Sequence, residues 1–107
     1  MPAASNGLDE PARAAVRSIL EQGLKTEVFP RADSPEEVQQ IIARLRAASD
    51  LKTKLVVAGF TLETITHAGI EQPCETCMYY LVHRRYCELP ELQLPVEPQW
   101  SCRLWRI

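Results

Sequence analysis

The stretch of sequence that decides the fold is residues 74–107, CETCMYYLVHRRYCELPELQLPVEPQWSCRLWRI. It holds all four cysteines of the chain, as one C-x-x-C pair and two single residues, and it has no glycine. Four of the eight prolines and five of the seven aromatic residues also fall in residues 73–107. This composition predicts little regular helix and indicates that four sulfur atoms organise the segment.

The cysteines are spaced Cys74-x2-Cys77-x9-Cys87-x14-Cys102, and three kinds of site are compatible with that spacing. A structural zinc site is tetrahedral and is commonly built from two close cysteine pairs, of which this chain has one. A thiol-redox site would use the C-x-x-C pair alone, normally at the start of a helix. An iron–sulfur cluster takes four thiolates that converge on it from separate directions.

An iron–sulfur cluster also needs surroundings that exclude water, because solvent exposure shifts its reduction potential. The side chains that would shield it lie within three positions of a cysteine: Met78, Tyr79, Tyr80, Tyr86, Leu89, Trp100 and Trp105. The same residues are also the expected core of a small lobe. One close pair and two single cysteines favour a [4Fe–4S] cluster, with Zn²⁺ as the alternative. The expected ligands are Cys74, Cys77, Cys87 and Cys102.

The order of these motifs resembles that of high-potential iron–sulfur proteins. The matching pieces are CETCMYY (74–80), CELP (87–90) and WSCRLW (100–105). The resemblance implies a [4Fe–4S] cluster on the four cysteines, aromatic shielding and one-electron chemistry, and it covers the last third of the chain. This chain departs from the family in a shorter gap after Cys77, in Ser101 before the last cysteine, and in Gln99 where the family has glycine.

Four thiolates around an inorganic core of about +2 leave a charge of about −2 in the lobe. Four arginines lie within four residues of a cysteine and are expected to tune that charge: Arg84, Arg85, Arg103 and Arg106. They would offset the cluster charge, raise its potential or dock an acidic partner, although a solvated surface residue is the preferred interpretation for each arginine taken alone. In a zinc site, His67 or His83 is an alternative ligand in place of one of the four cysteine thiolates.

The first part of the chain predicts helices. Residues 1–8 are expected to form a flexible tail, and Asp9 to cap a helix that stops near Gly23. Ser34 followed by Pro35 and by a glutamate at the third helical position predicts the start of a second helix.

Segment 51–69 divides at Gly59 into two stretches with helical apolar spacing. Two short helices joined by a glycine turn are typical of a helix-turn-helix motif. The stretch 61–69 has no lysine or arginine to contact phosphates or bases, so two packed helices are the preferred interpretation.

The length of 107 residues fits one small domain, and a net charge of −2 gives no electrostatic case for binding nucleic acid or an anionic membrane. The sequence shows neither a long apolar run nor a signal peptide, which predicts a cytoplasmic protein with reduced cysteines. A periplasmic or secreted protein remains an alternative, because a mature chain would also lack its signal.

Together these patterns predict an α+β fold. Three to four short helices in residues 9–72 precede an irregular or β lobe, residues 73–107, which is organised around a four-cysteine metal site and expected to be disordered without metal. No catalytic motif is visible, so no enzyme is expected. The expected function is one-electron transfer or redox sensing with a protein partner. The alternative is an adaptor or regulator with a structural metal that binds protein or, less strongly favoured, DNA through segment 51–69.

Overall fold

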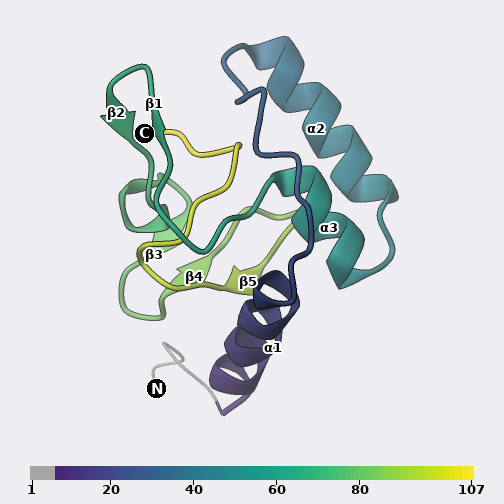
Figure 1. Ribbon diagram of the computed structural model, residues 1–107, viewed down its shortest axis with the longest axis vertical. Coiled ribbons are helices and arrows are strands. Elements are labelled where there is room, and N and C mark those ends of the chain that lie inside the picture. Colours follow the sequence, from purple (N-terminus) through teal and green to yellow (C-terminus); the bar gives the residue numbers. More distant parts are fainter. Residues whose placement is uncertain (1–6) are drawn as a thin grey trace.

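The computed structural model describes residues 7–107 (Figure 1). Three helices come first: α1 (Asp9–Glu21), α2 (Pro35–Ala47) and α3 (Leu51–Ala58). An antiparallel hairpin of β1 (Thr66–His67) and β2 (Ile70–Glu71) leads to the 3-10 helix η1 (Cys74–Thr76). An antiparallel sheet then forms from β3 (Tyr80–Leu81), β4 (Tyr86–Cys87) and β5 (Leu94–Pro95), in that order. The predicted α+β class is confirmed; most of the predicted tail 1–8 lies outside the described residues.

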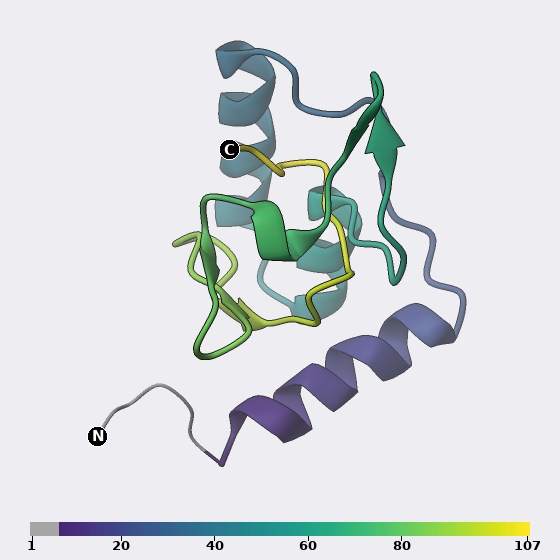
Figure 2. The ribbon, with the colours of Figure 1, turned by 90° about the vertical axis from the view of Figure 1, so that its left-hand side faces the viewer.

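The helices occupy two different sides of the lobe, which we define as residues 73–107. Helix α2 packs on α3, whereas α1 lies apart from them and contacts β5. Figure 2 shows α1 as a single rod that crosses beneath the lobe. None of the helices in residues 7–107 has the length and apolar character needed to cross a membrane.

One hydrophobic core joins the helices to the lobe. Its least exposed members, each 1% exposed or less, come from α1, α2, α3, the segment after α3 and the lobe: Val16, Leu45, Leu55, Ala58, Phe60, Val96 and Trp100. Cys74 and Cys102 belong to the same buried cluster. The lobe therefore does not have a separate core, and its packing depends on the helices.

The ends of the first two helices test the predicted caps. The hydroxyl of Ser34 accepts the backbone N–H of Glu37 at 3.2 Å, as predicted for α2, while the Glu37 carboxylate accepts the backbone N–H of Asp33 at 3.1 Å. The predicted cap of α1 is wrong. Leu8 occupies the cap position, and Asp9 is instead the first helical residue, with a side chain only 5% exposed.

Segment 61–69 is not helical. The preferred prediction of two packed helices in 51–69 is therefore wrong, and so is the helix-turn-helix alternative. Helix α3 ends as predicted at Gly59, which is left-handed (φ 69°). After it, Thr61 exchanges backbone hydrogen bonds of 2.8 and 3.1 Å with Ser101 in the lobe, and the chain then forms the β1–β2 hairpin. Hydrogen bonds to a distant segment replace the local ones of the predicted helix.

The lobe turns without glycine. Between β3 and β4 the chain reverses through Arg85, and between β4 and β5 it passes through Gln93; both residues have left-handed backbones, with φ of 51° and 50°. The first of these turns closes the β3–β4 hairpin, in which Tyr80 pairs with Cys87 and Leu81 with Tyr86.

Candidate four-cysteine site

Backbone hydrogen bonds bring the four cysteines together from four places in the lobe. Cys74 begins η1 and donates its N–H to the carbonyl of Trp100 at 2.6 Å, which places η1 beside the chain that leads to Cys102. Cys77 follows η1, and Cys87 lies in β4 opposite Tyr80 of β3. The η1 helix and the sheet thus fix the backbone positions of the four cysteines, and a shared metal site on them stays a prediction.

All four cysteines are free thiols, and they lie near one another in a largely buried region. Cys74 and Cys102 are each 8% exposed, and Cys77 and Cys87 are partly buried. Burial raises the pKa of Cys74 well above its usual range, that of Cys87 to about 11 and that of Cys102 to about 12. The neighbouring thiols raise these pKa values further, so each sulfur lies within electrostatic reach of the others.

Two of the sulfurs face backbone N–H groups. The N–H of Leu89 hydrogen-bonds to the sulfur of Cys87, and the N–H of Leu104 to that of Cys102; each lowers the pKa of its cysteine, against the larger effect of burial. Both donors stand two residues after the cysteine. Such N–H groups stabilise a thiolate and are among the groups that set the potential of an iron–sulfur cluster.

The four thiols do not form a ligand set for a single ion. Within residues 7–107, no three side chains of cysteine, histidine, aspartate or glutamate are arranged to hold one metal ion. Zinc needs its sulfurs about 2.3 Å from one centre. Within the described residues, the structure therefore does not show the predicted organisation of the lobe around a single metal ion.

The expected shielding residues differ in burial. Trp100 and Tyr86 are buried, at 1% and 9% exposure, whereas Met78 is 57% exposed. The side chains of Tyr79, Tyr80 and Trp105 are partly buried. Sequence reasoning missed two further buried neighbours in the same core, Leu92 and Leu104. Their only signal is apolar character within a few residues of a cysteine.

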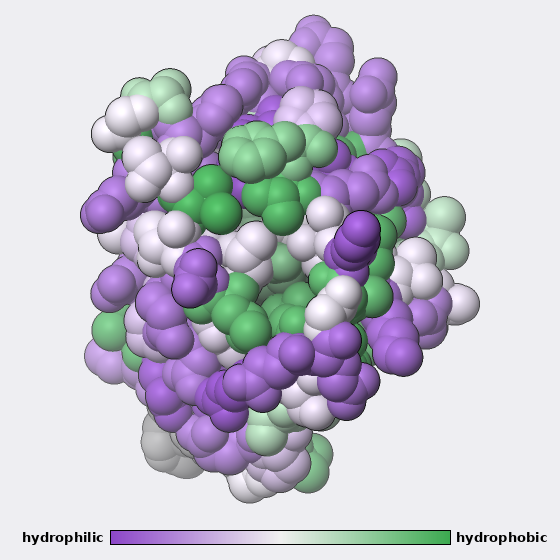
Figure 3. All heavy atoms as spheres, in the orientation of Figure 1, coloured by the Kyte–Doolittle hydropathy of each residue, from purple (hydrophilic) through white to green (hydrophobic). Residues whose placement is uncertain are grey.

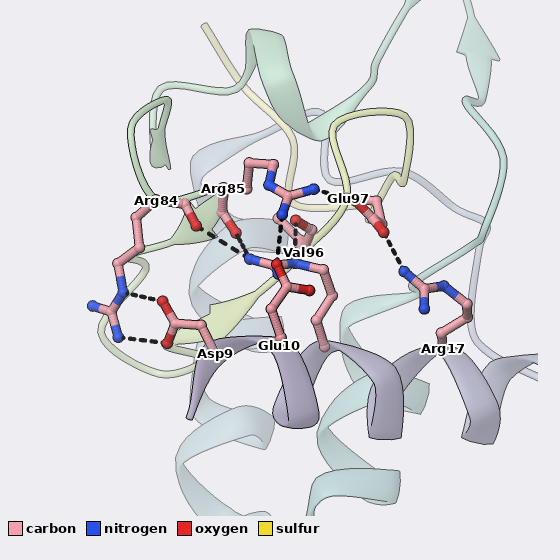
Figure 4. Close-up of polar contacts among 8 residues, drawn as sticks. Asp9, Glu10, Arg17, Arg84, Arg85, Val96 and Glu97 are labelled. Atoms are coloured by element: carbon pink, nitrogen blue, oxygen red, sulfur yellow. Dashed lines mark hydrogen bonds and ion pairs between the residues drawn. The ribbon is translucent and has the colours of Figure 1, made fainter. Parts of the chain in front are cut away.

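Arg84 and Arg85 bind helix α1 (Figure 4). The guanidinium of Arg84 donates to both carboxylate oxygens of Asp9, at 2.7 and 2.9 Å. Arg85 pairs with Glu10 at 2.6 Å and with Glu97 at 3.2 Å. The positive charges of both arginines are thus balanced by carboxylates.

Arg103 is also paired, although it directly follows Cys102. It is 5% exposed, donates to the carbonyl of Val57 at 2.9 Å and meets the carboxylate of Glu27 at 3.2 Å. Arg106 is exposed, and its backbone carbonyl accepts the N–H of Met78 at 2.7 Å. Of the four arginines expected to tune the site, three are therefore committed to carboxylates.

Within residues 7–107, the two histidines are not arranged with the cysteines as metal ligands. His67, in β1, meets the carboxylate of Asp33 at 3.2 Å. His83 is exposed in the turn between β3 and β4. Neither joins a group of side chains that could hold a metal ion in residues 7–107.

A separate apolar cleft lies between the end of α1 and the segment that follows α3. It has a volume of about 350 Å³ and is lined by Leu20, Leu24, Thr26, Phe60, Thr61, Leu62, Glu63 and Ile65. Figure 3 shows apolar side chains gathered in a hollow near the middle of this face, with hydrophilic side chains around it. Glu63 is the one titratable residue of its lining, so the cleft offers no acid–base pair.

The chain matches no protein-family model, no curated protein and no solved structure. Its function therefore has to be argued from the chemistry of the four thiols. The four thiols are soft ligands and free of disulfides, and Cys74 and Cys102 lie in the apolar core, which are properties that suit the ligands of an iron–sulfur cluster.

Proposed function

We propose that the protein binds a [4Fe–4S] cluster through Cys74, Cys77, Cys87 and Cys102 and acts in one-electron transfer or redox sensing with a protein partner. One observation carries the proposal: four free thiols from separate parts of the lobe lie within electrostatic reach of one another in a largely buried region. Bound to these thiols, the cluster supplies reversible one-electron chemistry.

The spacing of the cysteines favours a cluster over zinc. One close C-x-x-C pair and two single cysteines suit a cube whose ligands approach from separate directions, whereas a structural zinc site is commonly built from two close pairs.

The protein's own residues would prepare the thiols for binding. Each thiol must lose its proton to become a ligand, and burial opposes this loss at Cys74, Cys87 and Cys102. The N–H groups of Leu89 and Leu104 favour the thiolates of Cys87 and Cys102. Cluster uptake therefore releases protons, and we expect it to become more favourable as the pH rises.

Electron exchange would take place on the side of Cys77. Cys74 and Cys102 are buried, whereas Cys77 is partly exposed and its neighbour Met78 is 57% exposed. A partner that covers Met78 would approach the site on its more exposed side. The arginines of the other sides are held by carboxylates, as described above.

Anaerobic purification followed by a visible spectrum and by iron, sulfide and zinc analysis tests the proposal. We expect a brown protein with about four irons and four sulfides per chain. Cys→Ser at each of the four positions should bleach the protein. Met78→Ser is the matched control, because it alters an exposed side chain next to Cys77, and it should keep the colour. A colourless wild-type protein that holds one zinc would disprove the proposal.

A further inference from the structure

Arg31 is a buried cation in the segment that links α1 to α2, and no sequence motif singles it out. Its side chain is 2% exposed. The guanidinium donates to the carbonyl of Cys102 at 2.8 Å, to the hydroxyl of Ser101 at 3.2 Å and to the side-chain oxygen of Gln72 at 2.7 and 3.0 Å. Its remaining nitrogen donates to the carbonyl of Val28 at 3.3 Å.

All of these acceptors are neutral. Among residues 7–107, Arg31 forms no ion pair with a carboxylate, in contrast to Arg84, Arg85 and Arg103. The carboxylate that acts on it from nearby, Asp33, is 64% exposed and meets His67. The acidic group with the largest electrostatic effect on Arg31 is instead the thiol of Cys102.

A buried charge without a counterion is unfavourable, because it loses its hydration and gains no attraction in return. The hydrogen bonds of Arg31 satisfy its N–H groups but do not neutralise its charge. A negative group beside Cys102 would do so. Four thiolates around a cluster carry a net charge of about −2 and would stand at that position.

We propose that Arg31 is the counterion of the four-cysteine site and that its fixed positive charge raises the reduction potential of the bound cluster. The inference rests on the proposed function. Arg31 is a positioning residue in this role: its guanidinium bonds to the carbonyl of Cys102 rather than to the sulfur.

The direction in which Arg31 shifts the reduction potential follows from the charge balance. On reduction, one electron passes from a one-electron donor to the cluster, no bond is made or broken, and the site becomes more negative by one unit. Arg31 keeps its proton throughout, because the guanidinium is always protonated. A fixed positive charge in a buried region stabilises the more negative state, so its loss favours the oxidised form.

Potentiometric titration of the full-length protein, with dithionite as the reductant and ferricyanide as the oxidant, tests this role. We expect Arg31→Met to shift the ratio of reduced to oxidised protein at least tenfold at a given potential, which lowers the midpoint by about 59 mV or more. Arg31→Lys retains the charge and should stay within threefold of wild type. Arg31→Gln, neutral but able to hydrogen-bond, makes the same comparison if the Met variant does not fold.

Arg13→Met is the matched control, because Arg13 is equally buried but is paired with Glu10. Arg13→Met should lower the stability of the protein but leave the ratio of reduced to oxidised protein within threefold of wild type. The role of Arg31 is refuted if the Met and Gln variants keep the ratio of reduced to oxidised protein within threefold of wild type. It is also refuted if the midpoint potential of the Lys variant falls as far as theirs. In either case, four irons and four sulfides per chain would still support the proposed function. A wild-type protein without iron and sulfide refutes both.

Discussion

Gly59 shows how one residue limits the close packing of two segments. It ends α3 with a left-handed backbone, and a Cβ atom placed on it would lie 2.3 Å from the carbonyl oxygen of Glu27. That carbonyl belongs to a backbone whose N–H donates to Val56 at 2.9 Å, so it is held in place. The helix end and the linker before α2 can approach only because position 59 lacks a side chain.

We expect Gly59→Ala to lower the free energy of unfolding by about 2 kcal/mol or more, because strain and a backbone clash act together. Urea denaturation measures this change. Gly23→Ala is the control: Gly23 also has a positive φ (91°), but no atom lies within 4 Å of its added Cβ. A loss no larger at Gly59 than at Gly23 would show that the clash is absent.

Local signals allowed some residues to be assigned from the sequence, and long-range contacts hid others. The cap of α2 at Ser34 and the end of α3 at Gly59 depend on residues within a few positions, and both are predicted from the sequence, whereas the close approach of Gly59 to Glu27 is not. Arg31 could not be predicted, because its role depends on acceptors 41 to 71 residues away. The four cysteines could be predicted as a set because their chemistry leaves few alternatives, whereas their separation depends on the strand register.

Helix α1 shows at the level of an element why an apolar stripe can mislead. Its buried positions are Asp9, Arg13, Val16 and Leu20, which recur at helical spacing. The first two are charged, so the apolar pattern marks only the second half of the buried face. Arg13 is 1% exposed and donates to the carbonyls of Arg84, Arg85 and Val96 at 3.0 to 3.1 Å.

We expect Arg13→Met to destabilise the protein by about 2–4 kcal/mol, because three carbonyls lose the donor that Arg13 supplies and Glu10 loses one of its two arginine partners. The control is Arg17→Met, since Arg17 is 38% exposed and pairs with Glu97 alone; its loss should be below about 1 kcal/mol. Equal losses in urea denaturation would contradict a special role of Arg13 in docking α1.

Segment 61–69 was assigned to a helix because Leu62 and Ile65 have helical spacing. In the fold, Ile65 accepts the backbone N–H of Gln72 at 2.9 Å, and Thr61 pairs with Ser101. Hydrogen bonds to partners that are distant in sequence override the local preference, and no pattern within the segment itself reveals them.

The helices and the lobe share one hydrophobic core, so the stability of the helices depends on that of the lobe. The sequence predicts a lobe that is disordered without metal, whereas the shared core indicates that the lobe stays folded with the helices. We therefore expect removal of iron by chelation to lower the stability of both parts together. Far-UV circular dichroism reports the helices, whereas the fluorescence of Trp100 and Trp105 reports the lobe. Coincident urea midpoints for the metal-free protein are the expected result, and two separate transitions would contradict a shared core.

The buried thiols make the metal-free protein sensitive to alkaline pH. The pKa of Cys87 is raised to about 11 and that of Cys102 to about 12, above the usual value of 9.0. Between the usual pKa of 9.0 and the raised pKa of each thiol, the unfolded chain has already lost thiol protons that the folded chain keeps. The free energy of unfolding therefore falls as the pH rises. We expect each thiol to lower the free energy of unfolding by roughly 1 kcal/mol between pH 8 and pH 10.

Urea denaturation of the reduced, metal-free protein at several pH values measures this loss. The Cys102→Ser variant should show a smaller dependence on pH, because it lacks one of the three thiols whose pKa burial raises. A dependence equal to that of wild type would mean that Cys102 ionises alike in the folded and unfolded chains.

The glycine-free turns of the lobe have a consequence for the unfolded chain. Residues 73–107 contain four prolines and no glycine, so this part of the chain samples fewer backbone conformations when unfolded. Folding then costs less conformational entropy than it would for a loop-rich segment of ordinary composition. Part of the lobe's stability thus originates in the stiffness of its unfolded state and corresponds to no contact in the native structure.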